Sequence, residues 1–173
     1  QKRFLISQAV SLALISTLDK LSVNDLSIKW PNDILVANKK IAGILIENSI
    51  KGDLINNSIV GIGLNINQIE FSDMEREPTS LKLLLKENFD IMQVLNSLLV
   101  ELKGYYSILN TNPKFIEKSY NETLYGRELC FPFQDEDSSF EGVIKGVNST
   151  GELQIQIGES IKNYGLKELK FKA

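Results

Sequence analysis

The segment VGIGLNIN, residues 60–67, constrains the fold of this chain more than any other stretch of its sequence. Apolar residues occupy every second position, and the positions between them hold Gly61, Gly63, Asn65 and Asn67. This alternation predicts a β-strand whose apolar side chains face a core. Two glycines leave the other face nearly bare, so it is either a floor for a flat or extended ligand, with Asn65 contacting the ligand's polar edge, or a surface that another segment covers.

The composition limits which functions the chain can have. Its 173 residues suit one medium domain, or a domain of about 120 residues with a small appendage. A net charge of −3, from 19 basic and 22 acidic residues, gives no electrostatic reason to expect nucleic-acid binding. Histidine is absent, which excludes histidine-based triads, imidazole bases and histidine metal ligands from this sequence. Any chemistry must use lysine, arginine, carboxylates, hydroxyls, amides and the backbone.

The cysteine count and the hydropathy pattern bear on location. Cys130 is the only cysteine, so no internal disulfide can form, and a reducing compartment such as the cytoplasm is expected. Because it lies in a strand-like run, Cys130 is expected to be a small buried hydrophobe. No apolar run reaches membrane-spanning length, and an apolar content of 43% supports a folded core.

Periodicity and cap residues predict a first part built of helices and a few strands. An amphipathic helix is expected over 4–21, and a polar loop over 68–78. Strands are expected over 34–37, 41–46 and 59–67, the first two joined by a tight turn at Asn38-Lys39-Lys40. Further helices are expected after Thr79 or Ser80, after Asp90 and from Asn112-Pro113.

The composition changes near residues 122–126, which we take as a domain boundary. Beyond it, the sequence shows short β-rich runs at 127–133, 139–147, 152–157 and 166–171, separated by turn residues. Such closely spaced short strands predict a small barrel.

The densest polar cluster lies in KWPNDILVANKKIAG, residues 29–43. Pro31 marks the exit of a strand, and Lys29, Asn32, Asp33 and Lys40 are expected near the mouth of a hairpin. Lysine neutralises oxyanions, and an aspartate can share a magnesium ion with phosphate oxygens, so the cluster suits a phosphate-bearing ligand. The alternative is a solvated turn, because lysine, asparagine and aspartate are common in hairpin loops.

Three motifs in this order and spacing resemble the catalytic domain of biotin protein ligases: KWPND from Lys29, KIAGILIE from Lys40 and GIGLNIN from Gly61. The later Thr79–Leu81 fits the same pattern, and GVIKGVNSTGELQIQ, residues 142–156, resembles the family's small SH3-like domain. The resemblance implies an α/β fold with a mixed sheet and helices, akin to class II synthetases, over residues 1–123. It implies an SH3-like β-barrel over residues 124–173.

The resemblance also implies an activity. Biotin protein ligases make biotinyl-5′-AMP from biotin and MgATP, then transfer biotin to a lysine of the biotin carboxyl carrier domain of acetyl-CoA carboxylase. By motif, Lys40 would contact the biotin carboxylate and the adenylate phosphate, and Lys29 would contact phosphate. Asp33 would lie near Mg²⁺ and Asn32 near adenine. Gly43, Gly61 and Gly63 would form the surface under the ligand, and Asn65 would contact adenine.

The sequence departs from the family upstream of these motifs. Members carry a Ser/Thr-rich biotin segment and a Gly-Arg-rich loop there, whereas residues 1–28 contain one arginine and no glycine. We therefore expect a C-terminal portion of a ligase, with weak or no biotin binding and little activity. A missing strand could leave a free sheet edge and favour a homodimer.

Two alternatives remain open. One is a lipoate ligase-like adenylating enzyme, since lipoate ligases share the fold and the adenylate chemistry. The other is a non-catalytic, truncated binding module. Arg127 and Lys167 could reach ATP from the C-terminal part, but both are expected to be surface residues.

Overall fold

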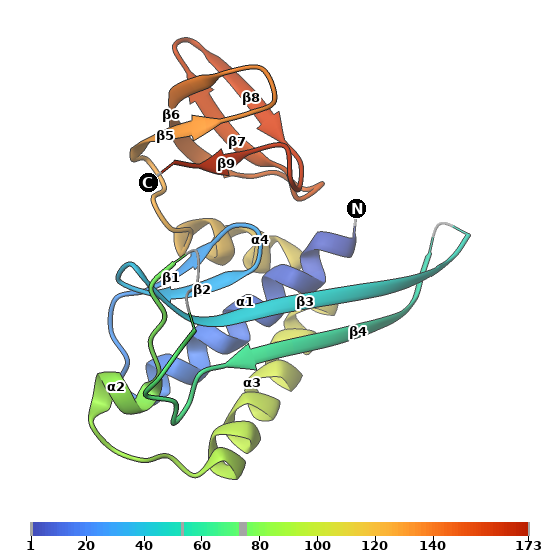
Figure 1. Ribbon diagram of the computed structural model, residues 1–173. Helices are drawn as coiled ribbons and strands as arrows, with labels where there is room; N and C mark the ends of the chain where they lie inside the picture. Colours follow the sequence, from blue (N-terminus) through green and yellow to red (C-terminus); the bar gives the residue numbers. More distant parts are fainter. Residues whose placement is uncertain (1, 53, 73–75, 173) are drawn as a thin grey trace.

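The computed structural model describes residues 2–52, 54–72 and 76–172, which form two antiparallel sheets and a layer of helices (Figure 1). The first part of the chain contains α1 (Lys2–Lys20), β1 (Leu26–Lys29), β2 (Asp33–Val36), β3 (Lys39–Lys51), β4 (Leu54–Leu64), α2 (Leu81–Leu85), α3 (Ile91–Thr111) and α4 (Pro113–Glu122). The second part contains β5 (Cys130–Gln134), β6 (Ser139–Val147), β7 (Leu153–Ile157), β8 (Ser160–Tyr164) and β9 (Lys170–Phe171).

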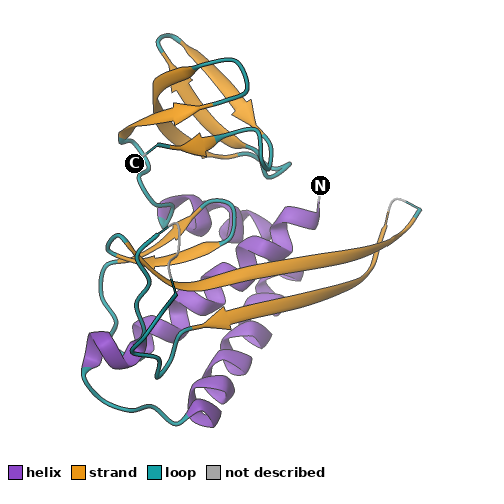
Figure 2. Ribbon diagram, in the orientation of Figure 1, coloured by secondary structure: helices purple, strands orange, loops and turns teal. Residues whose placement is uncertain are grey.

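The first sheet has the strand order β1-β2-β3-β4, and helices α1, α3 and α4 lie on one side of it (Figure 2). Every named ladder in it is antiparallel, so the predicted mixed sheet is observed as an antiparallel one with isolated parallel bridges such as Lys40–Pro78. The core between the sheet and α1 contains fully buried aliphatic side chains: Leu14, Leu18, Ile28, Ile34 and Ile41. The mixed α/β class expected from the sequence is confirmed.

The ladder between β3 and β4 determines which residues face the helices. It pairs Ile44 with Ile62, while Gly43 pairs with Gly63 and Leu45 with Gly61. Because successive residues of a strand point to opposite faces, the isoleucines lie on the helix-covered face and the glycines on the other. The alternation predicted for residues 60–67 is thus observed along β4.

Three helix starts follow the cap residues named from the sequence. The Ser80 hydroxyl accepts a hydrogen bond from the backbone N–H of Leu83, and the Asp90 carboxylate accepts one from Met92. Asn112 caps α4, and Pro113 occupies its first turn, where its missing N–H costs nothing. The three predicted caps are thus confirmed. A cap depends on local chemistry, so the sequence suffices to predict it.

The two hairpins differ in detail from the expected ones. The β2–β3 turn is made at Ala37 and Asn38, with Ala37 at a φ of 51°, and Lys39 and Lys40 already belong to β3. Strand β4 starts at Leu54 rather than at residue 59 and ends at Leu64. Beyond Leu64, the Asn65 N–H still donates to the Ile41 carbonyl of β3, while the Asn65 carbonyl accepts from Leu81 at the start of α2.

The second sheet has the order β8-β7-β6-β5-β9, and its aromatic core includes Phe133, whose ring lies 5.0 Å from that of Phe171. The expected strands are present within a few residues, but β8 was not expected. The ladders among described residues do not join β8 to β9, so the predicted closed barrel is not shown. Cys130 is exposed at the start of β5, contrary to its expected burial.

The described part of the chain contains no helix that is both long and apolar enough to cross a membrane.

Tyr120 of α4 gives a prediction about stability. Its side chain is fully buried, its ring lies 5.6 Å from that of Phe4, and its hydroxyl has no hydrogen-bond partner among the described residues. Burial raises the pKa of this phenol. We expect Tyr120→Phe to increase the free energy of unfolding by about 1 kcal/mol in urea titrations at pH 7, because it removes an unsatisfied polar group.

The pH dependence has a definite sign. A raised pKa in the folded protein means that stability is complete below the unfolded pKa of about 10 and falls as the pH rises beyond it. Tyr120→Phe should reduce this alkaline loss. For stability at pH 7 the matched control is Tyr164→Phe, which removes a hydroxyl that donates to Asp135 at 3.2 Å and should not stabilise the protein. Equal effects of the two substitutions at pH 7 would contradict this interpretation.

Candidate functional site

The predicted site begins at the tight connection between β1 and β2. Lys29 and Asp33 are paired across this hairpin, with Trp30, Pro31 and Asn32 between them. The Trp30–Pro31 peptide bond is cis, and the Trp30 indole donates a hydrogen bond to the Gly151 carbonyl at 3.0 Å. The expected strand exit at Pro31 is therefore present, and the hairpin is tied to the second sheet.

Lys40 and Asp33 form the central ion pair of the site. The Lys40 ammonium lies 2.6 Å from the Asp33 carboxylate, and the side chains are only 26% and 17% exposed. The pairing of Asp33 with Gly43 in the β2–β3 ladder brings the two side chains together. A Cβ built on Gly43 would lie 3.3 Å from Lys40 Nζ, so the amine lies directly over this glycine.

Gly61 and Gly63 form a bare strip beside that pair. A Cβ on Gly63 would meet only the Gly43 carbonyl, at 3.9 Å, and one on Gly61 only the backbone oxygen and Cβ of Leu45. Both glycines are exposed. No described side chain covers the strip, which favours the ligand-floor interpretation over the covered-strand alternative. Gly43 differs from the other two, because Lys40 fills the space above it.

The side-chain amides of the two predicted asparagines donate hydrogen bonds to backbone carbonyl groups. Asn32 donates to the Ile44 carbonyl and Asn65 to the Thr79 carbonyl, each at 2.9 Å. These bonds hold the hairpin against β3 and the end of β4 against the loop before α2. One of the two N–H donors of each amide is therefore engaged, and contacts of either residue with adenine stay predictions.

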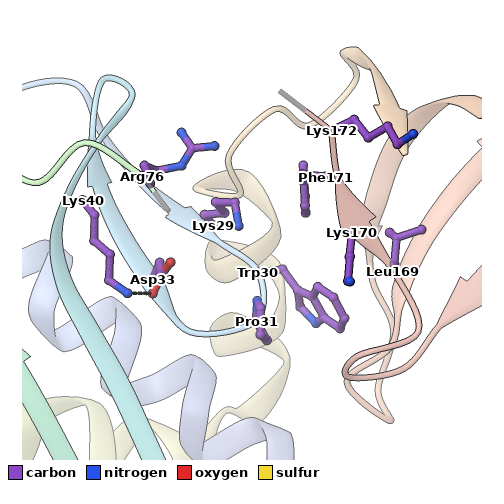
Figure 3. A pocket seen from close by; sticks show the side chains of 10 residues that line it. All are labelled: Lys29, Trp30, Pro31, Asp33, Lys40, Arg76, Leu169, Lys170, Phe171 and Lys172. Carbon is purple, nitrogen blue, oxygen red and sulfur yellow. Dashed lines mark ion pairs between the residues drawn. The ribbon is translucent and has the colours of Figure 1, made fainter. Parts of the chain in front are cut away.

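A cleft of about 440 Å³ opens next to the Lys40–Asp33 pair, between the first sheet and the C-terminal segment (Figure 3). One wall comes from the β1–β2 hairpin, β3 and the loop before α2, and the other from residues 169–172. The lining contains five cationic side chains and one carboxylate: Lys29, Lys40, Arg76, Lys170, Lys172 and Asp33. Such an excess of positive charge suits an anionic ligand.

The sequence pattern missed several of these residues. Arg76 lies in a loop expected only to be polar, and Lys170 and Phe171 lie far along the chain. Phe171 contacts the cluster directly, because the Lys29 ammonium lies 4.6 Å from its ring centroid. Arg127 and Lys167, the candidates from the C-terminal part, line other cavities. No local motif marks β9, so only its pairing with β5 places it at the cleft.

Arg76 is held in place at the cleft. Its guanidinium donates to the Asn38 carbonyl at 3.0 Å and lies 5.2 Å from the Tyr125 ring centroid. Tyr125 in turn donates to the Asn38 side chain. The residue after Arg76 lies beside β3, because the Glu77 carbonyl accepts a hydrogen bond from the Lys40 N–H. This loop therefore positions both Arg76 and the backbone of Lys40.

The site offers little for a resident metal ion. The described residues contain no group of three or more acidic or cysteine side chains able to hold one. Among the described residues, Asp33 is the single carboxylate that lines the cleft. This donor set fits a magnesium ion that arrives with a nucleotide and takes its other ligands from phosphate and water.

These features together describe an α/β protein with an open backbone floor, a lysine at its end and a cation-lined cleft. The fold matches the biotin protein ligase of Aquifex aeolicus with a TM-score of 0.81 at 22% identity, over 99% of this chain and 76% of that chain. The same enzyme in complex with biotin and ATP matches with a TM-score of 0.80.

Sequence comparison points in the same direction. Residues 2–65 match the Biotin/lipoate A/B protein ligase family. The chain is 28% identical over 173 residues to the bifunctional ligase/repressor BirA of Bacillus subtilis and 29% identical over 177 residues to biotin–protein ligase 2 of Arabidopsis thaliana. It spans 51% of the length of each of these relatives. The resemblance to biotin protein ligases is thus confirmed: the chain is similar to them in both sequence and fold.

The Lys40–Asp33 pair gives a prediction about stability with an internal control. Asp33→Asn leaves a partly buried ammonium without its counter-charge and should lower the free energy of unfolding by about 1 kcal/mol. The control is Glu77→Gln, which breaks the more exposed Lys39–Glu77 pair, with 49% and 68% of the side chains accessible. It should cost less than about 0.5 kcal/mol. Urea unfolding of both variants checks the difference, and equal losses would contradict it.

Proposed function

We propose that this chain carries the adenylate-forming site of a biotin protein ligase. In the proposed reaction, biotin and ATP give biotinyl-5′-AMP and pyrophosphate, and biotin is then transferred to a lysine of the biotin carboxyl carrier domain of acetyl-CoA carboxylase. The observation that carries the proposal is the uncovered strip at Gly61 and Gly63, which ends at the Lys40 amine. A planar or extended acyl-adenylate needs such a floor, with a cation at its phosphate.

The first step joins two anions. A carboxylate oxygen of biotin attacks the α-phosphorus, a new P–O bond forms, and the bond to pyrophosphate breaks. Bringing these anions within reacting distance is electrostatically unfavourable, and Lys40 is placed to lie between them and to stabilise the charge of the pentavalent transition state. Lys29 would bind phosphate oxygens at the adjoining cleft.

The second step needs no histidine. The neutral amine of the carrier lysine attacks the acyl carbon, an amide C–N bond forms, and the C–O bond to AMP breaks while the amine loses a proton to water. AMP is a good leaving group. The floor would hold the adenylate in place, with Asn32 and Asn65 at the adenine and Gly43 beneath Lys40.

Magnesium is proposed as the metal that accompanies ATP. When bound beside Asp33, it would supply charge neutralisation for the leaving pyrophosphate. Asp33 makes an ion pair with Lys40 at 2.6 Å, so its carboxylate would serve both cations.

Other features expected from the family are proposed with the function. Residues 1–123 would form the catalytic unit and residues 124–173 an SH3-like unit, with a cytoplasmic location. A homodimer is proposed from the outer edge of β4, which no described strand pairs. A free edge of eleven residues is a ready surface for pairing with a second copy.

Two alternatives are separated by experiment. The matched family includes lipoate ligases, so lipoate could replace biotin as the acid. A non-catalytic module would bind nucleotide or carrier without forming an adenylate. The motif pair of KWPND with KIAG favours biotin.

The activity prediction concerns ATP–pyrophosphate exchange. Because residues 1–28 carry no Gly-Arg-rich loop, we expect only weak exchange that depends on biotin, and we expect Lys40→Ala to lower it at least about 100-fold, since the cation between the two anions is removed. The exposed Lys39→Ala is the control and should retain exchange. Exchange with lipoate and not biotin would favour the first alternative. ATP binding without any exchange would favour the second, and absence of both would overturn the proposal.

The floor gives a separate prediction. Gly63→Ala meets no side chain in the fold, so unfolding in urea should change by less than about 1 kcal/mol. A methyl group on the floor should nevertheless weaken ATP binding at least about tenfold in calorimetry, because it takes space from the ligand. Gly104→Ala, on α3 with open space around it, is the matched control and should leave affinity unchanged. Unchanged affinity in Gly63→Ala would show that the ligand does not lie on this strip.

A further inference from the structure

We propose that Arg76 and Lys170 form a two-sided clamp for the phosphates of ATP that leave as pyrophosphate. This inference rests on the proposed function and assigns roles to two residues that lie outside the sequence motifs. They are 94 positions apart in the chain, yet they line opposite walls of the same cleft (Figure 3).

The position of the cleft indicates which phosphates it would receive. The strip at Gly61 and Gly63 ends at the Lys40–Asp33 pair, where the reacting α-phosphate would lie. From that pair the cleft leads to residues 169–172. A nucleotide on the strip would therefore extend its remaining phosphates into the space between Arg76 and Lys170.

Arg76 is preorganised for this role. Its contacts with the Asn38 carbonyl and the Tyr125 ring fix the plane of the guanidinium, so little side-chain entropy is lost on binding. The bond to Asn38 uses Nη1 and leaves further N–H donors of the fork for oxygen atoms. A planar fork matches two oxygens of a phosphate group.

Lys170 supplies charge from the second sheet. It begins β9, and its backbone is paired with Gln134 of β5, so the ladder holds its Cα against the cleft. Its side chain makes no hydrogen bond or ion pair within the described residues. The nearby Lys172 differs, because its ammonium donates to the Ser139 hydroxyl at 2.9 Å. Lys170 also borders a neighbouring hollow with Asp135, Glu136 and Glu168, and on this wall of the cleft it is the lysine that no described side chain engages.

The charges of the cleft support an oligophosphate. Among the described residues that line it, there are five cations and one carboxylate, and that carboxylate is already paired with Lys40. Such clustering is repulsive without an anion and is relieved by a ligand with several negative charges. A single phosphate would use only part of the cluster.

The test compares three probes by calorimetry and by the fluorescence of Trp30, which lines the cleft and is the only tryptophan. ATP, inorganic pyrophosphate and AMP are titrated into the full 173-residue chain and into Arg76→Ala, Arg76→Lys and Lys170→Ala. The controls are Arg127→Ala and Lys162→Ala, which remove cations outside this cleft. Circular dichroism and urea unfolding establish that each variant is folded.

Arg76→Ala and Lys170→Ala should each weaken ATP and pyrophosphate binding about tenfold. The dissociation constant for AMP should stay within about twofold of that of the unmodified chain. Arg76→Lys should recover part of the loss, because it keeps the charge but not the fork. The controls should bind all three probes normally. Equal weakening of ATP and AMP, or no weakening, would overturn the clamp while leaving the proposed function intact. If the unmodified chain binds none of the probes, the clamp and the proposed function both fail.

Discussion

The register of the β3–β4 ladder is the constraint on which the site depends. It places Gly43 opposite Gly63 and Leu45 opposite Gly61, while Ile44 and Ile62 pair on the face that the helices cover. A slip of one residue would turn the isoleucines outward and the glycines into the core. Packing of the aliphatic face against the helices therefore also determines which residues lie on the opposite face. The register that stabilises the sheet is the one that leaves the glycine strip uncovered.

The Lys40–Asp33 pair joins this floor to the cleft. The β2–β3 ladder brings the two residues together, and the loop that precedes α2 binds the backbone of Lys40 on its other side, with Thr79 donating to the Lys40 carbonyl. Gly43 is needed for a different reason than Gly61 and Gly63, since the lysine itself lies over it. Strand β3 thus carries the cation, and β4 carries the bare strip that this cation bounds.

The second sheet is attached to the first through specific contacts. Trp30 donates a hydrogen bond to the Gly151 carbonyl, and the Lys29 ammonium lies over the Phe171 ring. The Ile28 N–H donates to the Thr123 carbonyl, and the Ile28 carbonyl accepts from Tyr125. These contacts bring the C-terminal segment to the mouth of the hairpin. The wall they form adds positive charge where the first sheet already has a cluster, so the cleft between the two sheets is lined mainly by cations.

The sequence by itself determined the local features of this protein: the alternation along β4, the caps at Ser80, Asp90 and Asn112, and the grouping of Lys29, Asp33 and Lys40 near one hairpin. Each of these depends on neighbours within a few residues, so period and residue type suffice to predict it. Tertiary structure alone decided the rest. It engaged the amides of Asn32 and Asn65 with backbone carbonyls, exposed Cys130, and brought Arg76 and Lys170 to one cleft. Those outcomes depend on contacts between segments far apart in the chain, and no local pattern encodes them, because strand pairing and packing select among many arrangements that the same residues could adopt.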